Sequence, residues 1–303
     1  MLEHMRIAVI GGDERQIFAA RTLREKGLEV VLFGMSDAAA RICPTLTSDA
    51  LEDAVSNADA VILPLPSSTD GVRLYCPLDP HISVRLTEIL HCMRKRLLLG
   101  GRLSEHFCKE AAHRDVICID YFHSEELQLR NALPTAEGAI YLAMRELPVT
   151  LFGTSAAIVG YGRIGSVLAQ RLKALGMRVY VYARRRESLV LAEIQGMIPM
   201  PLLGEGKTSS LKALPKDCRV LFNTVPARLI ERDVLEKMPR ECVLIDLASV
   251  PGGVDQIVAK EMGFQSIWGT ALPGKCTPES AGKILGEAWF QILSEHLPLE
   301  ASL

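Results

Sequence analysis

Short runs of β-branched and other apolar residues alternate with longer amphipathic stretches along the whole chain. This alternation is typical of parallel strands that are connected by crossover helices. In the first half it predicts strands at residues 6–10, 29–33, 60–63, 96–99 and 116–119. In the second half it predicts strands at residues 155–159, 178–182, 220–223, 243–247 and 266–269. The predicted fold class is therefore α/β, with two doubly wound parallel sheets.

The connections between these strands are expected to be helical. Residues 14–26 form the clearest predicted helix, because apolar residues recur at helical spacing and Gly27 supplies a stop signal. A second helical pattern covers residues 134–144, with Pro134 at its start, and a third covers residues 278–296. We expect these two helices to cross between two domains. The predicted domains are a flavodoxin-like domain of residues 1–133 and 276–303, and a Rossmann domain of residues 134–275.

The composition argues against several kinds of partner. The chain has 303 residues, 49% hydrophobic and 23% charged, and 34 Lys and Arg against 36 Asp and Glu give a net charge of −2. This near balance gives no electrostatic reason to expect a nucleic acid or a membrane as partner. The first apolar run, residues 7–10, is too short for a signal peptide or a membrane span, so we expect a cytoplasmic protein.

Cysteine and histidine spacing gives no support for a metal site. The 8 cysteines contain no C-x-x-C pair, and the 7 histidines form neither H-x-x-x-H nor H-E-x-x-H. Several cysteines lie inside apolar runs, where a thiol behaves as a small hydrophobic group. We expect reduced structural thiols and no bound metal.

A glycine-rich segment follows the strand at 155–159 and opens an amphipathic helix, in the order that a βαβ unit needs. In dinucleotide-binding folds the first glycine permits the tight turn, the second lets the backbone approach a pyrophosphate, and the third lets helix and strand pack closely. The alternative is a glycine-rich turn without a nucleotide. The predicted cofactor-binding residues of the segment are Gly160, Tyr161, Gly162, Arg163, Ile164 and Gly165.

The end of the next predicted strand carries positive charge. NAD enzymes usually place a carboxylate there, about 20 residues beyond the glycines, to bind the ribose hydroxyls. This chain has Arg184, Arg185 and Arg186 instead. Because guanidinium groups bind phosphate bidentately, the run favours NADP over NAD as the cofactor. The alternative is a solvated basic turn.

Polar residues also follow two later strands, whose carboxyl ends are expected to face the nicotinamide. They could present donors to the carboxamide or to the substrate, whereas ordinary turn chemistry and helix capping explain any single one of them equally well. The predicted cofactor contacts in these segments are Asn223, Thr224, Val225, Pro226, Asp246, Ala248 and Ser249.

The layout of two α/β domains, a crossing helix and a returning C-terminal helix resembles the D-2-hydroxyacid dehydrogenase superfamily. Four segments resemble, more specifically, the A subunits of dipicolinate synthase: IAVIGGDERQ at 7–16, NALPTAEG at 131–138, DLAS followed by PGG at 246–253, and LPGK at 272–275. The resemblance implies NADP-dependent oxidation of a dihydrodipicolinate-type precursor from the lysine pathway to pyridine-2,6-dicarboxylate. It also implies a flavoprotein B subunit as partner and the mother-cell compartment of a sporulating bacterium, and we expect a homo-oligomer.

One position departs from the wider superfamily. Ordinary 2-hydroxyacid dehydrogenases need an arginine after the fifth Rossmann strand and a histidine near the returning segment, but this chain has Val250 at the first position and no histidine in residues 272–275. A 2-keto acid reductase is therefore disfavoured. Val250 also argues against assigning to this chain every substrate contact of the dipicolinate synthase family, in which a basic residue can occupy this position. Two alternatives stay open: a non-catalytic nucleotide-binding scaffold for the flavoprotein, and a dehydrogenase of another cyclic imine or amino acid.

A dicarboxylate substrate can be held by cations, hydroxyls and exposed amides at strand ends of the first domain. An N-cap, a polar turn or a solvated helix residue explains each candidate equally well. The candidate substrate-binding residues are Arg15, Gln16, Ser67, Ser68, Thr69, Gly100, Gly101 and Arg102.

Two charged residues on the inter-domain connections are candidate catalytic groups, because either could orient the substrate or relay a proton. These are Lys275 and Glu137. The alternatives are an ion pair between Lys275 and a helix carboxylate, and a first-turn position of Glu137 that the helix dipole favours.

Overall fold

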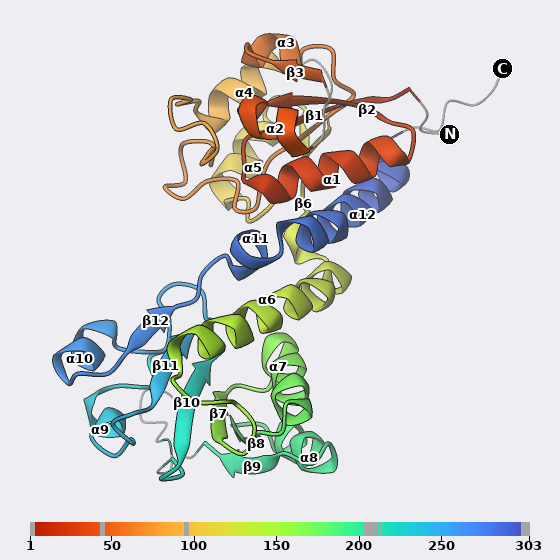
Figure 1. Ribbon diagram of the computed structural model, residues 1–303. Coiled ribbons are helices and arrows are strands. Elements are labelled where there is room, and N and C mark those ends of the chain that lie inside the picture. Colours follow the sequence, from red (N-terminus) through yellow and green to blue (C-terminus); the bar gives the residue numbers. More distant parts are fainter. Residues whose placement is uncertain (1–3, 43–45, 94–96, 203–210, 212–213, 298–303) are drawn as a thin grey trace. The chain divides into compact units, whose positions relative to one another are not determined.

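The computed structural model describes residues 4–42, 46–93, 97–202, 211 and 214–297. The chain divides into two compact units, which we call unit 1 (Met1–Asn131 with Thr277–Leu303) and unit 2 (Ala132–Cys276). Each contains a parallel six-stranded sheet with flanking helices (Figure 1). The predicted fold class of two doubly wound parallel sheets is therefore confirmed.

The sheet of unit 1 has the strand order β3-β2-β1-β4-β5-β6. Its strands are β1 (Arg6–Ile10), β2 (Glu29–Phe33), β3 (Leu46–Ser48), β4 (Ala60–Ile62), β5 (Leu97–Gly100) and β6 (Ile117–Asp120). The sequence pattern does not predict β3, because its three residues show no apolar alternation. The five predicted strands alone follow the flavodoxin-like order 2-1-3-4-5, and β3 extends the sheet at the β2 edge to the order 3-2-1-4-5-6.

Both faces of this sheet are covered, which explains the nearly continuous apolar runs of its strands. Along β1, Ile7 and Val9 point into one apolar cluster while Ala8 and Ile10 point into another. The helices of unit 1 are α1 (Glu14–Glu25), α2 (Ser36–Ile42), α3 (Leu51–Val55), α4 (Leu86–Cys92), α5 (Glu105–Ala112), the 3-10 helix η1 (Tyr121–His123) and α12 (Pro278–His296).

The C-terminal helix α12 lies against α1 in unit 1 (Figure 1). A Cβ atom at Gly282 would stand 2.5 Å from the carbonyl oxygen of Arg15, so the missing side chain permits this close packing. Further along α12, the fully buried Trp289 packs edge-on against Tyr121, with ring centroids 5.7 Å apart. The last segment of the chain therefore completes the core of unit 1.

The sheet of unit 2 has the strand order β12-β11-β10-β7-β8-β9, which is the order of unit 1 read from the opposite edge. Its strands are β7 (Ser155–Val159), β8 (Arg178–Ala183), β9 (Ile198–Pro201), β10 (Cys218–Asn223), β11 (Val243–Asp246) and β12 (Ser266–Trp268). The sequence pattern does not predict β9, whose prolines are typical of loops and are accepted here at a sheet edge. The helices are α7 (Arg163–Ala174), α8 (Arg186–Ile194), α9 (Arg232–Leu235), α10 (Gln256–Glu261) and α11 (Leu272–Cys276).

Helix α6 (Glu125–Glu146) begins in unit 1 and continues into unit 2. The prediction that Pro134 starts this helix is wrong, because Pro134 lies inside it. A proline in a helix removes one backbone donor, and buried neighbours such as Leu127 and Ala132 offset this loss. Among the described residues, no helix combines the length and the apolar character that a membrane span requires.

Candidate functional site

A cavity of about 700 Å³ lies in unit 2 where the loops after β7, β8 and β10 meet. The strand order of the sheet reverses between β7 and β10, and doubly wound sheets bind ligands at this switch point. The sequence predicts eight of the lining residues as cofactor contacts: Gly160, Tyr161, Gly162, Arg184, Arg185, Thr224, Val225 and Pro226. It does not predict the others, which are Ala183, Ser188, Leu202, Ala227, Arg228, Leu229 and Glu231.

The glycine turn has the space that a pyrophosphate needs. Gly160 has φ +97°, a conformation that favours glycine. A Cβ at Gly165 would stand 2.2 Å from the Gly160 carbonyl oxygen, so α7 packs directly on the turn. A Cβ at Gly162 would meet nothing within 4 Å, and no side chain caps α7 at this residue. The turn therefore offers open backbone donors to an anion, and the residues fit a dinucleotide.

The residues around this turn have different roles. Thr224 donates its hydroxyl to the carbonyl of Val159 at 3.0 Å, which ties the loop after β10 to the end of β7. Tyr161 donates to Gln195 Oε1 at 2.5 Å, and burial raises the pKa of Tyr161. Arg163 is exposed and does not line the cavity, while Ile164 packs against the core of unit 2.

Two of the three arginines in the run line the cavity, and the third does not. Arg184 and Arg185 are exposed and line the cavity at the end of β8. Arg186 is exposed but is the first residue of α8 and does not line the cavity. Among the described lining residues, Glu231 is the one carboxylate, and it lies at the start of α9. The edge of the cavity at β8 therefore carries positive charge.

Asn223 and Asp246, two of the expected cofactor contacts, do not line the cavity. Both are fully buried, and Asn223 Nδ2 donates to Asp246 Oδ1 at 2.7 Å. The Asp246 carboxylate also accepts the amides of Ala248 (3.1 Å), Gly253 (2.8 Å) and Val254 (2.9 Å). These polar contacts hold the loop after β11 onto β10. Neither the buried Ala248 nor the exposed Ser249 lines the cavity.

Unit 1 has the same strand order, but its first turn is closed. The amide of Gly12 donates to the carbonyl oxygen of Tyr75 at 2.7 Å, and a Cβ at Gly11 would stand 2.8 Å from that same oxygen. The side chains of Asp13 and Gln16 cap α1 reciprocally. In unit 1, protein atoms therefore fill the position that corresponds to the anion site at the glycine turn of unit 2.

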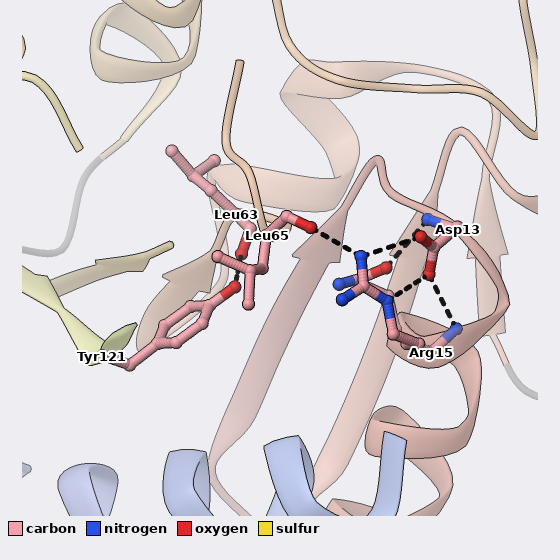
Figure 2. A network of polar contacts seen from close by, with 6 residues as sticks. Asp13, Arg15, Leu63, Leu65 and Tyr121 are labelled. Atoms are coloured by element: carbon pink, nitrogen blue, oxygen red, sulfur yellow. Dashed lines mark hydrogen bonds and ion pairs between the residues drawn. The ribbon is translucent and has the colours of Figure 1, made fainter. Parts of the chain in front are cut away.

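Arg15, a candidate substrate-binding residue, is buried in unit 1 and held by protein partners (Figure 2). Its Nε and Nη2 atoms donate to the two Asp13 carboxylate oxygens, both at 2.8 Å, and Nη2 also donates to the Leu65 carbonyl at 2.6 Å. Burial lowers the pKa of Arg15, but the hydrogen bonds and charge of Asp13 outweigh it and the pKa is raised. The residue is 4% exposed, so Arg15 joins the start of α1 to the loop after β4.

The neighbouring candidates Gln16, Ser67, Gly100 and Gly101 are buried as well. Gln16 Oε1 accepts the Asp13 amide at 2.8 Å. Ser67 Oγ accepts the Gly101 amide at 3.0 Å and lies 3.0 Å from the Gly101 carbonyl oxygen. These contacts join the loops after β4 and β5, and they leave these four residues no exposed side chain to offer a substrate.

Three candidates at this edge of the sheet remain accessible. Thr69 and Arg102 are exposed and Ser68 is half-buried, with its hydroxyl donating to Asp70 Oδ1 at 2.9 Å. Arg102 has φ +58°, and its guanidinium lies 5.1 Å from the centre of the Phe122 ring. A positive φ in a residue other than glycine stores strain that often marks a functional position. Because Arg15 is buried and Arg102 is exposed, Arg102 is the accessible cation among the expected substrate-binding residues.

The two candidate catalytic residues differ in their surroundings. Glu137 lies on α6, and its Oε1 atom is 3.6 Å from Arg171 Nε of α7. Lys275 lies on α11, is exposed, and forms no ion pair with any described residue. The described residues also contain no group of three His, Cys, Asp or Glu side chains that could hold a metal ion.

Both units match family models. Residues 6–122 match the model of the N-terminal domain of the dipicolinate synthase A subunit. Residues 137–254 match the model described as "D-isomer specific 2-hydroxyacid dehydrogenase, NAD binding domain". The second match contains the glycine turn and the arginine run.

Relatives match the chain over nearly its whole length. The dipicolinate synthase A subunit of Bacillus subtilis (strain 168) is 29% identical over 296 residues, which cover 97% of this chain and 98% of the relative. The crystal structure of the dipicolinate synthase A subunit from Bacillus halodurans has a TM-score of 0.83 and 26% identity, covering 97% of this chain and 99% of that one. The Bacillus subtilis crystal structure has a TM-score of 0.81 and 27% identity, covering 97% of each chain.

Proposed function

Because the chain belongs to the family of dipicolinate synthase A subunits, we propose that it is the NADP-dependent dehydrogenase subunit of a dipicolinate synthase. The substrate would be a dihydrodipicolinate-type precursor and the product pyridine-2,6-dicarboxylate. The observation that carries this proposal is the open glycine turn at Gly162, in a cavity whose edge holds Arg184 and Arg185 instead of a carboxylate.

The reaction suits such a site. Bound NADP would supply a hydride acceptor for a ring C–H of the substrate. The accompanying proton leaves to a base or to water, and aromatisation of the ring supplies driving force. The work of the protein is to hold two anionic molecules, the dinucleotide at the glycine turn of unit 2 and a dicarboxylate at accessible cations and hydroxyls.

We assign the substrate carboxylates to Arg102, Ser68 and Thr69, which are the accessible members of the candidate set. We assign proton transfer or substrate orientation to Lys275, whose ammonium group no described carboxylate neutralises. The ion pair with Arg171 makes Glu137 a weaker candidate, because protonation of its carboxylate would break that pair.

The Lys275 assignment can be tested with a matched control. Lys275→Met is expected to lower kcat by at least tenfold, while Lys283→Met, at an exposed position of α12, leaves it unchanged. Both variants are expected to melt like the parent. Equal turnover in all three proteins would exclude Lys275 from the reaction.

The matched relatives are each one subunit of a synthase, which implies a further subunit. We propose a flavoprotein B subunit as this partner and the mother-cell compartment of a sporulating bacterium as the place of action. A homo-oligomer of the chain belongs to the same proposal.

The experiment that tests the function combines the purified chain, alone and with the flavoprotein, with NADP and freshly generated precursor. We expect NADPH and dipicolinate to appear in equal amounts, and their absence under both conditions would contradict the proposal. Gly162→Asp is the informative variant, because full synthase activity with an intact complex would favour a scaffold role. NADP reduction that dipicolinate does not inhibit would instead favour another cyclic imine as substrate.

A further inference from the structure

A groove lies in unit 1 between the start of α6 and the C-terminal helix α12. Its volume is about 210 Å³, and it shares no lining residue with the cavity at the glycine turn. Its lining on α12 runs from Ile284 to Glu295, which is about 16 Å along the helix at 1.5 Å per residue. Pockets for small molecules usually measure about 300–1,000 Å³. The groove is therefore small for a cofactor but long enough for about three turns of another helix.

The floor of this groove is apolar. Ile284, Ala288 and Ile292 follow one another at a spacing of four residues and so lie on one face of α12, and Leu127 contributes from α6. The three residues of α12 are half-buried and pack against the core of unit 1, while Leu127 is 2% exposed. Because apolar surface in contact with water is unfavourable, this floor favours a partner that covers it.

The polar residues of the groove carry negative charge that the protein does not neutralise. Glu287 and Glu295 line the groove from α12, and no described lysine or arginine forms an ion pair with either carboxylate. Arg130 lines the groove from α6, but its Nη2 atom is 2.8 Å from Glu126 Oε1, so these two charges cancel. With three glutamates and one arginine, the lining has a net charge of −2.

This charge decides which occupant fits the groove. The phosphates of a nucleic acid or of an anionic membrane would be repelled. In a symmetric dimer the same patch faces itself, so Glu287 and Glu295 would meet the same acidic patch of a second copy. A divalent cation needs several oxygen ligands around one point, and the described residues contain no group of three metal-binding side chains. A helix with basic residues beside an apolar stripe satisfies both the floor and the charge.

We propose that this groove docks an amphipathic helix of the flavoprotein subunit. Aliphatic side chains of that helix would cover Ile284, Ala288 and Ile292, and two basic side chains would pair with Glu287 and Glu295. The inference rests on the proposed function, because it assigns a surface to the partner named there. The two glutamates are eight residues apart, about 12 Å along α12, so we expect the basic residues of the partner helix at a similar separation.

The charges and the floor are expected to affect different rate constants. Charges at the edge of an interface mainly steer association, and this effect weakens as the salt concentration rises. Contacts with an apolar floor mainly set the dissociation rate. The double variant Glu287→Lys/Glu295→Lys reverses both charges and leaves the floor intact. Ala288→Phe fills the groove with a side chain of the chain itself and leaves the charges unchanged.

Binding kinetics of the full chain with the flavoprotein subunit, measured at low and at high salt, test the inference. We expect the double variant to lower the association rate constant by about tenfold at low salt and by less at high salt. Ala288→Phe is expected to raise the dissociation rate constant by about tenfold. Glu193→Lys changes the same residue type at an exposed position of α8 in unit 2, and this matched control leaves both rate constants unchanged. Every variant is expected to melt like the parent and to keep its affinity for NADP.

The outcomes distinguish this inference from the proposed function. If the parent binds the flavoprotein and neither groove variant changes a rate constant, the docking surface is wrong and the proposed function stands. Self-association of the parent that Ala288→Phe abolishes would assign the groove to a second copy and overturn the inference. A parent that reduces NADP but binds no flavoprotein overturns the partner and its docking surface, while the dehydrogenase proposal stands. If the complex forms through the groove but reduces no NADP, the dehydrogenase proposal alone fails.

Discussion

Two glycines of the same turn are expected to respond differently to the same added methyl group. A Cβ at Gly165 would stand 2.2 Å from the Gly160 carbonyl oxygen, whereas real Cβ contacts are essentially never shorter than 3.0 Å. The turn and α7 must therefore separate by at least 0.8 Å, the difference between 3.0 and 2.2 Å. The obstacle is backbone and cannot rotate away. Overpacking of this kind costs about 3 kcal/mol, so Gly165→Ala is expected to lower the melting temperature by roughly 10 °C.

Gly162→Ala places its methyl group in open space, at φ −94°, a value that alanine adopts readily. Its effect on stability is expected to stay below about 1 kcal/mol, the cost of a less favourable N-cap residue. The methyl group would lie where the pyrophosphate approaches the first amides of α7. Because a hydrogen bond to a charged group contributes about 1.5–3 kcal/mol, losing one weakens dinucleotide binding by at least tenfold.

Thermal melting and calorimetric titration with NADP measure the two effects separately. The expected pattern is a destabilised Gly165→Ala and a stable Gly162→Ala that binds NADP poorly. Parental NADP affinity in Gly162→Ala would show that the dinucleotide does not lie on this turn. Equal destabilisation of the two variants would refute the packing argument.

Further predictions concern buried and exposed charges. Asp246→Asn leaves one side-chain oxygen to accept from four donors. We expect the free energy of unfolding, measured in urea, to fall by about 3–5 kcal/mol. An unchanged unfolding midpoint would contradict the role of this buried network. Arg15→Met is expected to destabilise unit 1 and to leave the KM for the substrate unchanged, because the residue is buried. Arg102→Met is expected to raise this KM and to leave stability unchanged, because the residue is exposed. The reverse pattern would show that Arg15 binds the substrate and Arg102 stabilises the fold. The amides of Arg73 and Val72 and the Ser68 hydroxyl lower the pKa of Asp70 to about 2. Since this pKa lies below the unfolded value, the stabilisation is present above about pH 4 and is lost as the pH falls through about 2, which a carboxyl NMR titration can follow.

The strands that the sequence predicts well are those buried on both faces. β1, β2 and β7 begin and end where the apolar runs do, because parallel strands in a covered sheet are apolar at every position. The sequence does not predict the edge strands β3 and β9, because β3 has a single apolar residue and β9 contains two prolines. It also misplaces the start of α6, since tertiary packing outweighs the local cost of Pro134.

The candidate site shows the same division between local and tertiary information. The glycine turn is local, so its sequence alone indicates the open position at Gly162. The burial of Arg15 depends on Asp13 and on the carbonyl of Leu65, 50 residues away, and a sequence pattern cannot distinguish this from a solvated arginine. Ser188 lines the cavity from α8, but its helical sequence pattern does not distinguish it from an ordinary helix residue.

The packing of α12 on α1 affects the order in which the chain can fold. Unit 2 is continuous from Ala132 to Cys276, so all of it has been translated before α12 is made. Unit 1 lacks Trp289 until the last part of the chain leaves the ribosome, and the apolar side of α1 stays uncovered for that time. We therefore expect the nucleotide-binding half of the protein to mature first, although it comes second in the sequence.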